Sequence, residues 1–121
     1  MSTNWPEIEP FEMPLPQDLR APVLRLWERT FDTSYASFEA VLAGAENDSN
    51  RNLLFLIHQD SVVAASCQLT VSRTGVLLGG VGEVAVADAH RKQGLATRLC
   101  RQARDWFWEQ RGEVVFLGTV N

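Results

Sequence analysis

The most informative segment of the sequence is Val84-Ala85-Val86-Ala87-Asp88-Ala89-His90-Arg91-Lys92-Gln93-Gly94-Leu95-Ala96-Thr97-Arg98-Leu99. An apolar strand ending at Val86 leads through a polar loop into a helix that opens at Gly94. A helix start exposes backbone N–H groups that have no partner inside the helix, and its dipole adds partial positive charge there. The pattern therefore predicts a site for a phosphate group at the beginning of this helix.

The side chains around this helix start suit a bound anion. Gly94 and Ala96 are small enough for a ligand to approach the backbone. Arg91 and Lys92 add positive charge beside the place where phosphate oxygens would lie, and Thr97 offers a hydroxyl. A glycine between a strand and a helix is also common in purely structural turns, so the glycine by itself is weak evidence.

Length and composition predict one packed domain over residues 1–121. The net charge of -4 gives no electrostatic reason to expect a nucleic-acid partner. Because no apolar run is long enough to cross a bilayer and no signal-peptide pattern opens the chain, we expect no membrane association and cytoplasmic residence. Cys67 and Cys100 are expected to be small core residues, and no metal-binding spacing occurs.

The N-terminal half predicts an extended segment followed by two helices. All five prolines lie within the first 22 residues, which is typical of an extended segment, assigned to residues 1–16. A short edge strand is expected within Ile8 to Met13. From about Asp18, apolar residues at spacings of three and four predict a helix, and a shorter helix that contains Tyr35 follows it.

The rest of the chain predicts a hairpin, a further strand, a helix and a last strand. The strand-like runs Asn52 to His58 and Ser61 to Val71 are separated by a short polar turn, which favours an antiparallel hairpin. The glycines before the next strand indicate that it begins by about Val81. The helix after Gly94 is expected to stop at Arg111-Gly112, and Val114 to Val120 to form the final strand.

The quoted stretch resembles motif A of the GNAT superfamily of acyl-CoA N-acyltransferases. The signature of that motif is Gln/Arg-x-x-Gly-x-Gly/Ala, which Arg91, Gly94 and Ala96 match. The order of the expected elements extends the resemblance over residues 17–121. It implies an α/β fold of the α+β kind, with a mixed, mostly antiparallel sheet flanked by helices.

The resemblance also implies where a cofactor binds. Backbone groups of Val84 and Val86 would contact the pantetheine arm of acetyl-CoA or another acyl-CoA. Asn121 resembles the Asn that closes the fifth strand of the family. The amides that would surround the pyrophosphate are those of Lys92, Gln93, Gly94, Leu95, Ala96 and Thr97.

The implied activity is transfer of the acyl group to a primary amine of an unknown acceptor, either a small molecule or a peptide. Such a reaction needs a group that accepts a proton from the amine and an N–H donor for the developing oxyanion. Glu83, at the start of the motif strand, is the best candidate base, and the alternative is a solvated edge carboxylate. A backbone N–H near Val86 is the candidate donor to the thioester oxygen.

The sequence departs from the family pattern after Asn121. Family members usually continue with a helix that often carries a tyrosine acid, and then with two more strands. The only tyrosine, Tyr35, falls in the second expected helix and is not matched to that acid. We therefore expect a C-terminally truncated enzyme, a site completed by a second chain, or a module that binds acyl-CoA without catalysis. A structural protein with a chance glycine loop is the remaining alternative. An unpaired last strand would favour association with another chain, such as a homodimer.

Overall fold

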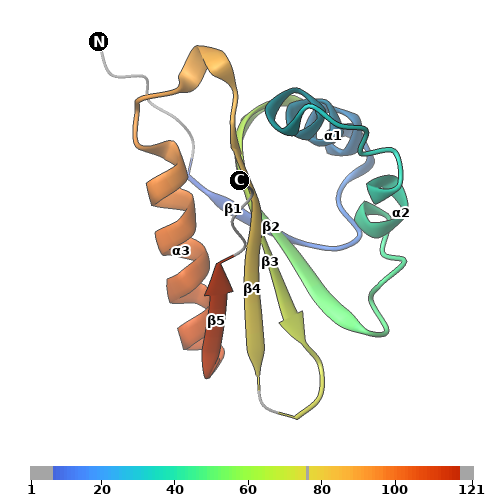
Figure 1. Ribbon diagram of the computed structural model, residues 1–121, viewed down its shortest axis with the longest axis vertical. Coiled ribbons are helices and arrows are strands. Elements are labelled where there is room, and N and C mark those ends of the chain that lie inside the picture. Colours follow the sequence, from blue (N-terminus) through green and yellow to red (C-terminus); the bar gives the residue numbers. More distant parts are fainter. Residues whose placement is uncertain (1–6, 76, 118–121) are drawn as a thin grey trace.

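A computed structural model describes residues 7–75 and 77–117 and shows helices on both faces of one sheet (Figure 1). The described strands lie in the order β1-β2-β3-β4-β5, with antiparallel pairing up to β4 and parallel pairing between β4 and β5. The predicted mixed, mostly antiparallel sheet is confirmed. In chain order the elements are β1 (Glu9–Glu12), α1 (Gln17–Phe31), α2 (Phe38–Leu42), β2 (Asn50–Gln59), β3 (Val62–Ser72), β4 (Leu78–Val86), the short 3-10 helix η1 (Asp88–His90), α3 (Leu95–Glu109) and β5 (Val114–Leu117).

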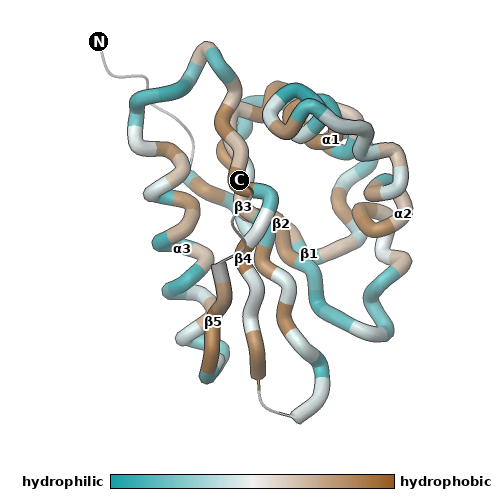
Figure 2. The backbone as a smooth tube through the Cα atoms, in the orientation of Figure 1, coloured by the Kyte–Doolittle hydropathy of each residue, from teal (hydrophilic) through white to brown (hydrophobic). Residues whose placement is uncertain are grey.

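The two faces of the sheet bury two separate apolar clusters. Alternation along β2 places Phe55 in the cluster beneath α3 and Leu54 in the cluster beneath α1. Figure 2 shows hydrophobic residues along the central strands and more hydrophilic ones at the bends between elements. The α3 side chains that are buried against the sheet are Leu95, Leu99, Ala103 and Phe107. Those of α1 are Leu19, Val23, Leu26 and Trp27. No described helix is both long and apolar enough to cross a membrane.

Three sequence expectations change in detail. Pro22, grouped above with the extended segment, lies inside α1. Proline has no backbone N–H, so position 22 cannot donate the helical hydrogen bond to the Asp18 carbonyl. Asp18 lies in the exposed first turn, and the burial of the apolar face of α1 outweighs the loss of this one bond. Tyr35 precedes α2 instead of lying in it. β4 begins at Leu78, because Gly79 is a strand residue paired with Val71 on β3.

The C-terminal strand is described up to Leu117, so the predicted remainder to Val120 and the candidate Asn121 lie outside the described residues. Val114 and Phe116 on β5 are 40% and 60% exposed. The association of this strand with another chain stays a prediction.

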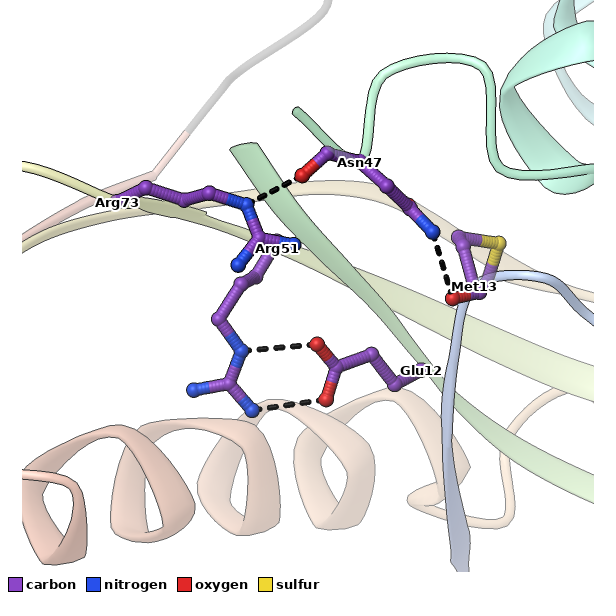
Figure 3. Close-up of polar contacts among 5 residues, drawn as sticks. All are labelled: Glu12, Met13, Asn47, Arg51 and Arg73. Atoms are coloured by element: carbon purple, nitrogen blue, oxygen red, sulfur yellow. Dashed lines mark hydrogen bonds and ion pairs between the residues drawn. The ribbon is translucent and has the colours of Figure 1, made fainter. Parts of the chain in front are cut away.

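Polar contacts fasten β2 to β1, and the loop before β2 to the end of β1 and to Arg73 after β3 (Figure 3). Arg51 donates two hydrogen bonds to the Glu12 carboxylate, at 2.9 Å from Nε and 2.8 Å from Nη2. The Asn47 side chain donates to the Met13 carbonyl at 3.1 Å, and Arg73 donates to the Asn47 carbonyl. The loop between α2 and β2 is thereby held beside the sheet, where it forms one wall of a cavity described below.

Candidate active site

The beginning of α3 presents backbone donors that the described part of the chain does not use. Gly94 has φ 75°, a left-handed conformation that favours glycine, and it turns the chain into the helix. The first amide of this region that bonds inside the helix is that of Arg98, which donates to the Gly94 carbonyl at 3.1 Å. Three amides before it have no backbone acceptor among the described residues, namely those of Leu95, Ala96 and Thr97.

These donors face a cavity of about 410 Å³, called here the α3 cavity. A Cβ atom built at Gly94 would meet nothing within 4 Å, so the space beside the loop is open. Leu95 packs its side chain into the core, which leaves only its amide for a ligand. Gln93 is absent from the cavity lining. The lining residues are Thr30, Val84, Val86, His90, Arg91, Lys92, Gly94, Leu95, Ala96 and Thr97. The structure therefore brings most of the predicted cofactor-binding residues together.

The cationic side chains of the loop are exposed and adaptable. Arg91 lies 3.2 Å from the Asp88 carboxylate, in an ion pair with both side chains more than half exposed. Exposed pairs of this kind contribute little to stability and exchange readily for another anion. Lys92 has φ 63°, which continues the tight path of the loop into Gly94. Both residues line the α3 cavity.

A bulge in β4 carries the candidate base. Ser66 on β3 pairs with Ala85, whereas Gln68 pairs with Gly82, so the register shifts between them. Glu83 lies in the extra length of β4 with φ 48°, unusual for a residue other than glycine. β5 pairs with β4 as far as Val81 among the described residues, and β4 continues beyond it to Val86. A bulge at this place directs Glu83 away from the regular alternation of the strand.

A chain of hydrogen bonds holds the bulge in this conformation. The Ser66 hydroxyl donates to the Glu83 carbonyl at 2.9 Å, and the Trp27 indole donates to the same hydroxyl at 2.9 Å. Trp27 and Ser66 are fully buried, so each of these groups needs its partner. α1 thus fixes the backbone of Glu83 through β3.

The carboxylate of Glu83 has its own partner in Tyr35. The phenol donates to Oε2 of Glu83 at 2.8 Å. Burial, the hydrogen bond to this carboxylate and its negative charge together raise the pKa of Tyr35 above that of a free tyrosine. The phenol therefore stays protonated near neutral pH and remains a donor. Sequence reasoning missed this role because Tyr35 and Glu83 are 48 residues apart.

Glu83 lines a second cavity, also of about 410 Å³, called here the Glu83 cavity. It lies against α2, the loop before β2, and strands β2 to β4, with Glu46, Gln68 and Phe116 among its lining residues. Val84, the next residue of β4, lines the α3 cavity. The α3 cavity and the Glu83 cavity are therefore lined by neighbouring residues of the same strand. Among the described residues, no group of three His, Cys, Asp or Glu side chains could hold a metal ion.

This arrangement has the elements of an acyl-transfer site, and the comparison with known proteins agrees with it. The model of the acetyltransferase (GNAT) family matches residues 15–121. The chain belongs to the GNAT family of acetyltransferases. The resemblance seen in motif A is thereby confirmed over nearly the whole sequence, whereas the role of each site residue stays a prediction.

Solved structures show the same GNAT fold. An acetyltransferase of Trypanosoma brucei matches with TM-score 0.70 and 17% identity, covering 95% of this chain and 84% of that chain. A predicted acetyltransferase of Clostridium acetobutylicum, crystallised with acetyl-CoA, matches with TM-score 0.70, 8% identity and coverages of 95% and 82%. The aminoglycoside 6'-N-acetyltransferase of Acinetobacter haemolyticus matches with TM-score 0.71, 20% identity and coverages of 94% and 79%. The search of curated proteins gave no match.

Proposed function

We propose that this GNAT chain binds acetyl-CoA, or another acyl-CoA, and transfers the acyl group to a primary amine. The observation that carries the proposal is the unpartnered start of α3, next to a strand whose bulge holds the Glu83 carboxylate. A site of this kind can hold a diphosphate at one end and deprotonate an amine at the other.

The residues at the start of α3 fit the pyrophosphate of coenzyme A. The amides of Leu95, Ala96 and Thr97 can donate to phosphate oxygens, and the helix dipole favours negative charge there. Gly94 leaves open space for the ligand, and Arg91 and Lys92 can supply further donors. A cofactor held in this way would lie beside Val84 and Val86, which line the same cavity.

The proposed chemistry assigns one proton transfer to Glu83. An amine arrives largely as its ammonium ion, and its nitrogen attacks only after losing a proton, which the Glu83 carboxylate accepts. The nitrogen lone pair then forms a bond to the thioester carbonyl carbon. The carbon–sulfur bond breaks, the nitrogen loses its extra proton as it becomes an amide, and the thiolate takes up that proton and leaves as the free thiol. Tyr35, which donates to Oε2 of this carboxylate, is a positioning residue for Glu83.

Thiol release from acetyl-CoA over a panel of amines tests this function, alongside calorimetric titration with acetyl-CoA. We expect Glu83→Gln to keep the affinity for acetyl-CoA and to lower kcat/KM by about a hundredfold or more, as for loss of a general base. Glu109→Gln, the same change at an exposed position at the end of α3, is the control and should have no effect. Wild-type turnover in Glu83→Gln would remove Glu83 from the mechanism. Binding without thiol release from any amine would instead show a non-catalytic module.

A further inference from the structure

Polar side chains form the floor of the Glu83 cavity where α1 no longer covers the sheet. Leu54 of β2 lies in the apolar cluster beneath α1, whereas Asn52, two residues earlier on the same face, lines the cavity. Gln68 and Thr70 lie beside it on β3. Asn52 is 2% exposed and Gln68 is 7% exposed. Buried amides at the bottom of a cavity suggest a recognition role, because an apolar floor would cost less to bury.

The orientation of these amides follows from their partners. The Glu46 carboxylate can only accept, so the Asn52 group that faces it at 3.3 Å is the amide nitrogen. The Asn52 oxygen then accepts from Gln68 Nε2 at 3.1 Å and from the Thr70 hydroxyl at 2.8 Å. Because Gln68 presents its nitrogen to Asn52, its oxygen must point elsewhere. These hydrogen bonds thus identify Oε1 as the polar atom of Gln68 that does not take part in them.

That remaining atom, Oε1 of Gln68, has no hydrogen-bond partner in the part of the chain that the structure describes. A buried acceptor without a donor is unfavourable, and such groups are rare in folded proteins. Gln68 lines the Glu83 cavity, but its Oε1 is covered by protein atoms, so a ligand in this cavity can supply the missing donor once a small turn of the Gln68 side chain exposes that oxygen. The missing partner is therefore an N–H or O–H group.

The charge of the cavity indicates which donor fits. Glu46 and Glu83 both line it, and no Lys, Arg or His is among its described lining residues. Gly80 and Gly82 leave the floor open, because a Cβ atom at either position would meet nothing within 4 Å. A cavity with two carboxylates and an unmet acceptor favours a cationic donor, that is, an ammonium group.

We propose that the acceptor of this enzyme is a diamine, with one amine at Glu83 and a second, ammonium group held by Gln68 Oε1 and the Glu46 carboxylate. The inference rests on the proposed function and adds the class of acceptor to it. The second ammonium group is not acylated. It binds, and it orients the reacting amine toward Glu83.

In the thiol-release assay, four amines of similar length separate the effect of the positive charge of the second group from the effect of its hydrogen-bond donor. Putrescine carries a second ammonium group, aminobutanol a hydroxyl donor, n-butylamine neither, and gamma-aminobutyrate a carboxylate. We expect kcat/KM to fall in that order, with putrescine exceeding n-butylamine by about tenfold or more, the scale of one charged hydrogen bond. Gamma-aminobutyrate should be the poorest acceptor, because its carboxylate meets two like charges.

Substitutions assign the preference to named atoms. Gln68→Met keeps the approximate shape of the side chain and removes the acceptor, and we expect it to lower the ratio of kcat/KM for putrescine to that for n-butylamine about tenfold. Glu46→Gln should reduce the putrescine advantage over aminobutanol and keep that of aminobutanol over n-butylamine. Gln59→Met, at an exposed position on β2, and Glu109→Gln are the matched controls.

The outcomes distinguish this inference from the function on which it rests. Equal turnover of putrescine and n-butylamine, or an unchanged preference in Gln68→Met, would overturn the diamine assignment and leave acyl transfer intact. If no amine releases thiol, the proposed function fails. Calorimetric titration of wild type and Gln68→Met with putrescine then still decides the recognition, since the wild type should bind putrescine about tenfold more tightly, and equal affinities would overturn the diamine assignment.

Discussion

The Tyr35 hydroxyl donates to the Glu83 carboxylate across 2.8 Å, joining the segment before α2 to the bulge of β4. Tyr35 is itself fastened, because its backbone N–H donates to the Glu28 carboxylate of α1 at 3.0 Å. The ring also packs beside Trp27 and Phe38, with centroid distances of 5.5 and 5.1 Å. The side chain that orients the candidate base is therefore placed by packing on α1 and α2.

Tyr35→Phe removes this hydrogen bond and keeps the ring. We expect kcat/KM to fall about tenfold, at unchanged affinity for acetyl-CoA, because the carboxylate loses its orientation. The stability loss should be about 1 kcal/mol, measured by urea unfolding. A purely structural role would predict the same kinetic loss in a Glu83→Gln background. The positioning role predicts no further loss there, because the two residues act as a unit.

The ionisation of Tyr35 can be followed directly, because it is the only tyrosine. Burial, and then the hydrogen bond and charge of Glu83, raise its pKa in the folded protein. The resulting stabilisation is fully present below about pH 10, the pKa of an unfolded tyrosine, and is lost as the pH rises above it. Phenolate absorbance should therefore appear at higher pH in the native protein than in urea. Glu83→Gln should reduce this difference in pH between the native and the unfolded titration. Coincident titrations would contradict the contact.

Two adjacent glycines of β4 should respond differently to the same substitution. A Cβ atom at Gly79 would lie 2.9 Å from the Phe107 ring, whereas one at Gly80 would meet nothing within 4 Å. Gly79→Ala should destabilise the fold by about 1–3 kcal/mol, because Phe107 is fully buried and cannot move aside freely. Gly80→Ala should change stability by less than about 0.5 kcal/mol. Equal effects in urea unfolding would show that α3 does not pack on β4 in this way.

The two cysteines are free and packed against each other in the core between β3 and α3. A hydrogen bond from the buried Cys67 thiol lowers the pKa of Cys100, against the opposing effect of burial. Cys67→Ala should therefore slow alkylation of Cys100 by iodoacetamide near neutral pH, as measured by mass spectrometry. Unchanged or faster alkylation would show that Cys67 does not stabilise the thiolate.

The helices and the hairpin could be predicted because each depends on residues that are close together in the sequence. Leu95, Leu99, Ala103 and Phe107 repeat every four residues, and all four are buried on one face of α3. The start of α3 could be predicted as an anion site because its residues are contiguous. The hairpin of β2 and β3 likewise follows from two apolar runs separated by a polar turn.

The remaining features depend on contacts between distant residues. Gln68 and Asn52 meet because of the β2–β3 register, and a shift by one residue would turn them to opposite faces. Glu83 takes its left-handed conformation without a glycine to signal it, because buried partners on β3 and α1 hold the bulge. No periodicity in the sequence carries that information.

The proposed function requires the amides at the start of α3 to hold the pyrophosphate of acetyl-CoA, and calorimetric titration of Ala96→Glu with acetyl-CoA measures whether they do. A carboxylate in the first turn interacts favourably with the helix dipole, so the fold should keep its stability. The same carboxylate would occupy and repel the phosphate site. Ala21→Glu, the same change at an exposed position of α1, is the control. We predict that Ala96→Glu lowers the affinity for acetyl-CoA by about tenfold or more while Ala21→Glu has no effect. Wild-type affinity for acetyl-CoA in a folded Ala96→Glu variant would show that the pyrophosphate binds elsewhere.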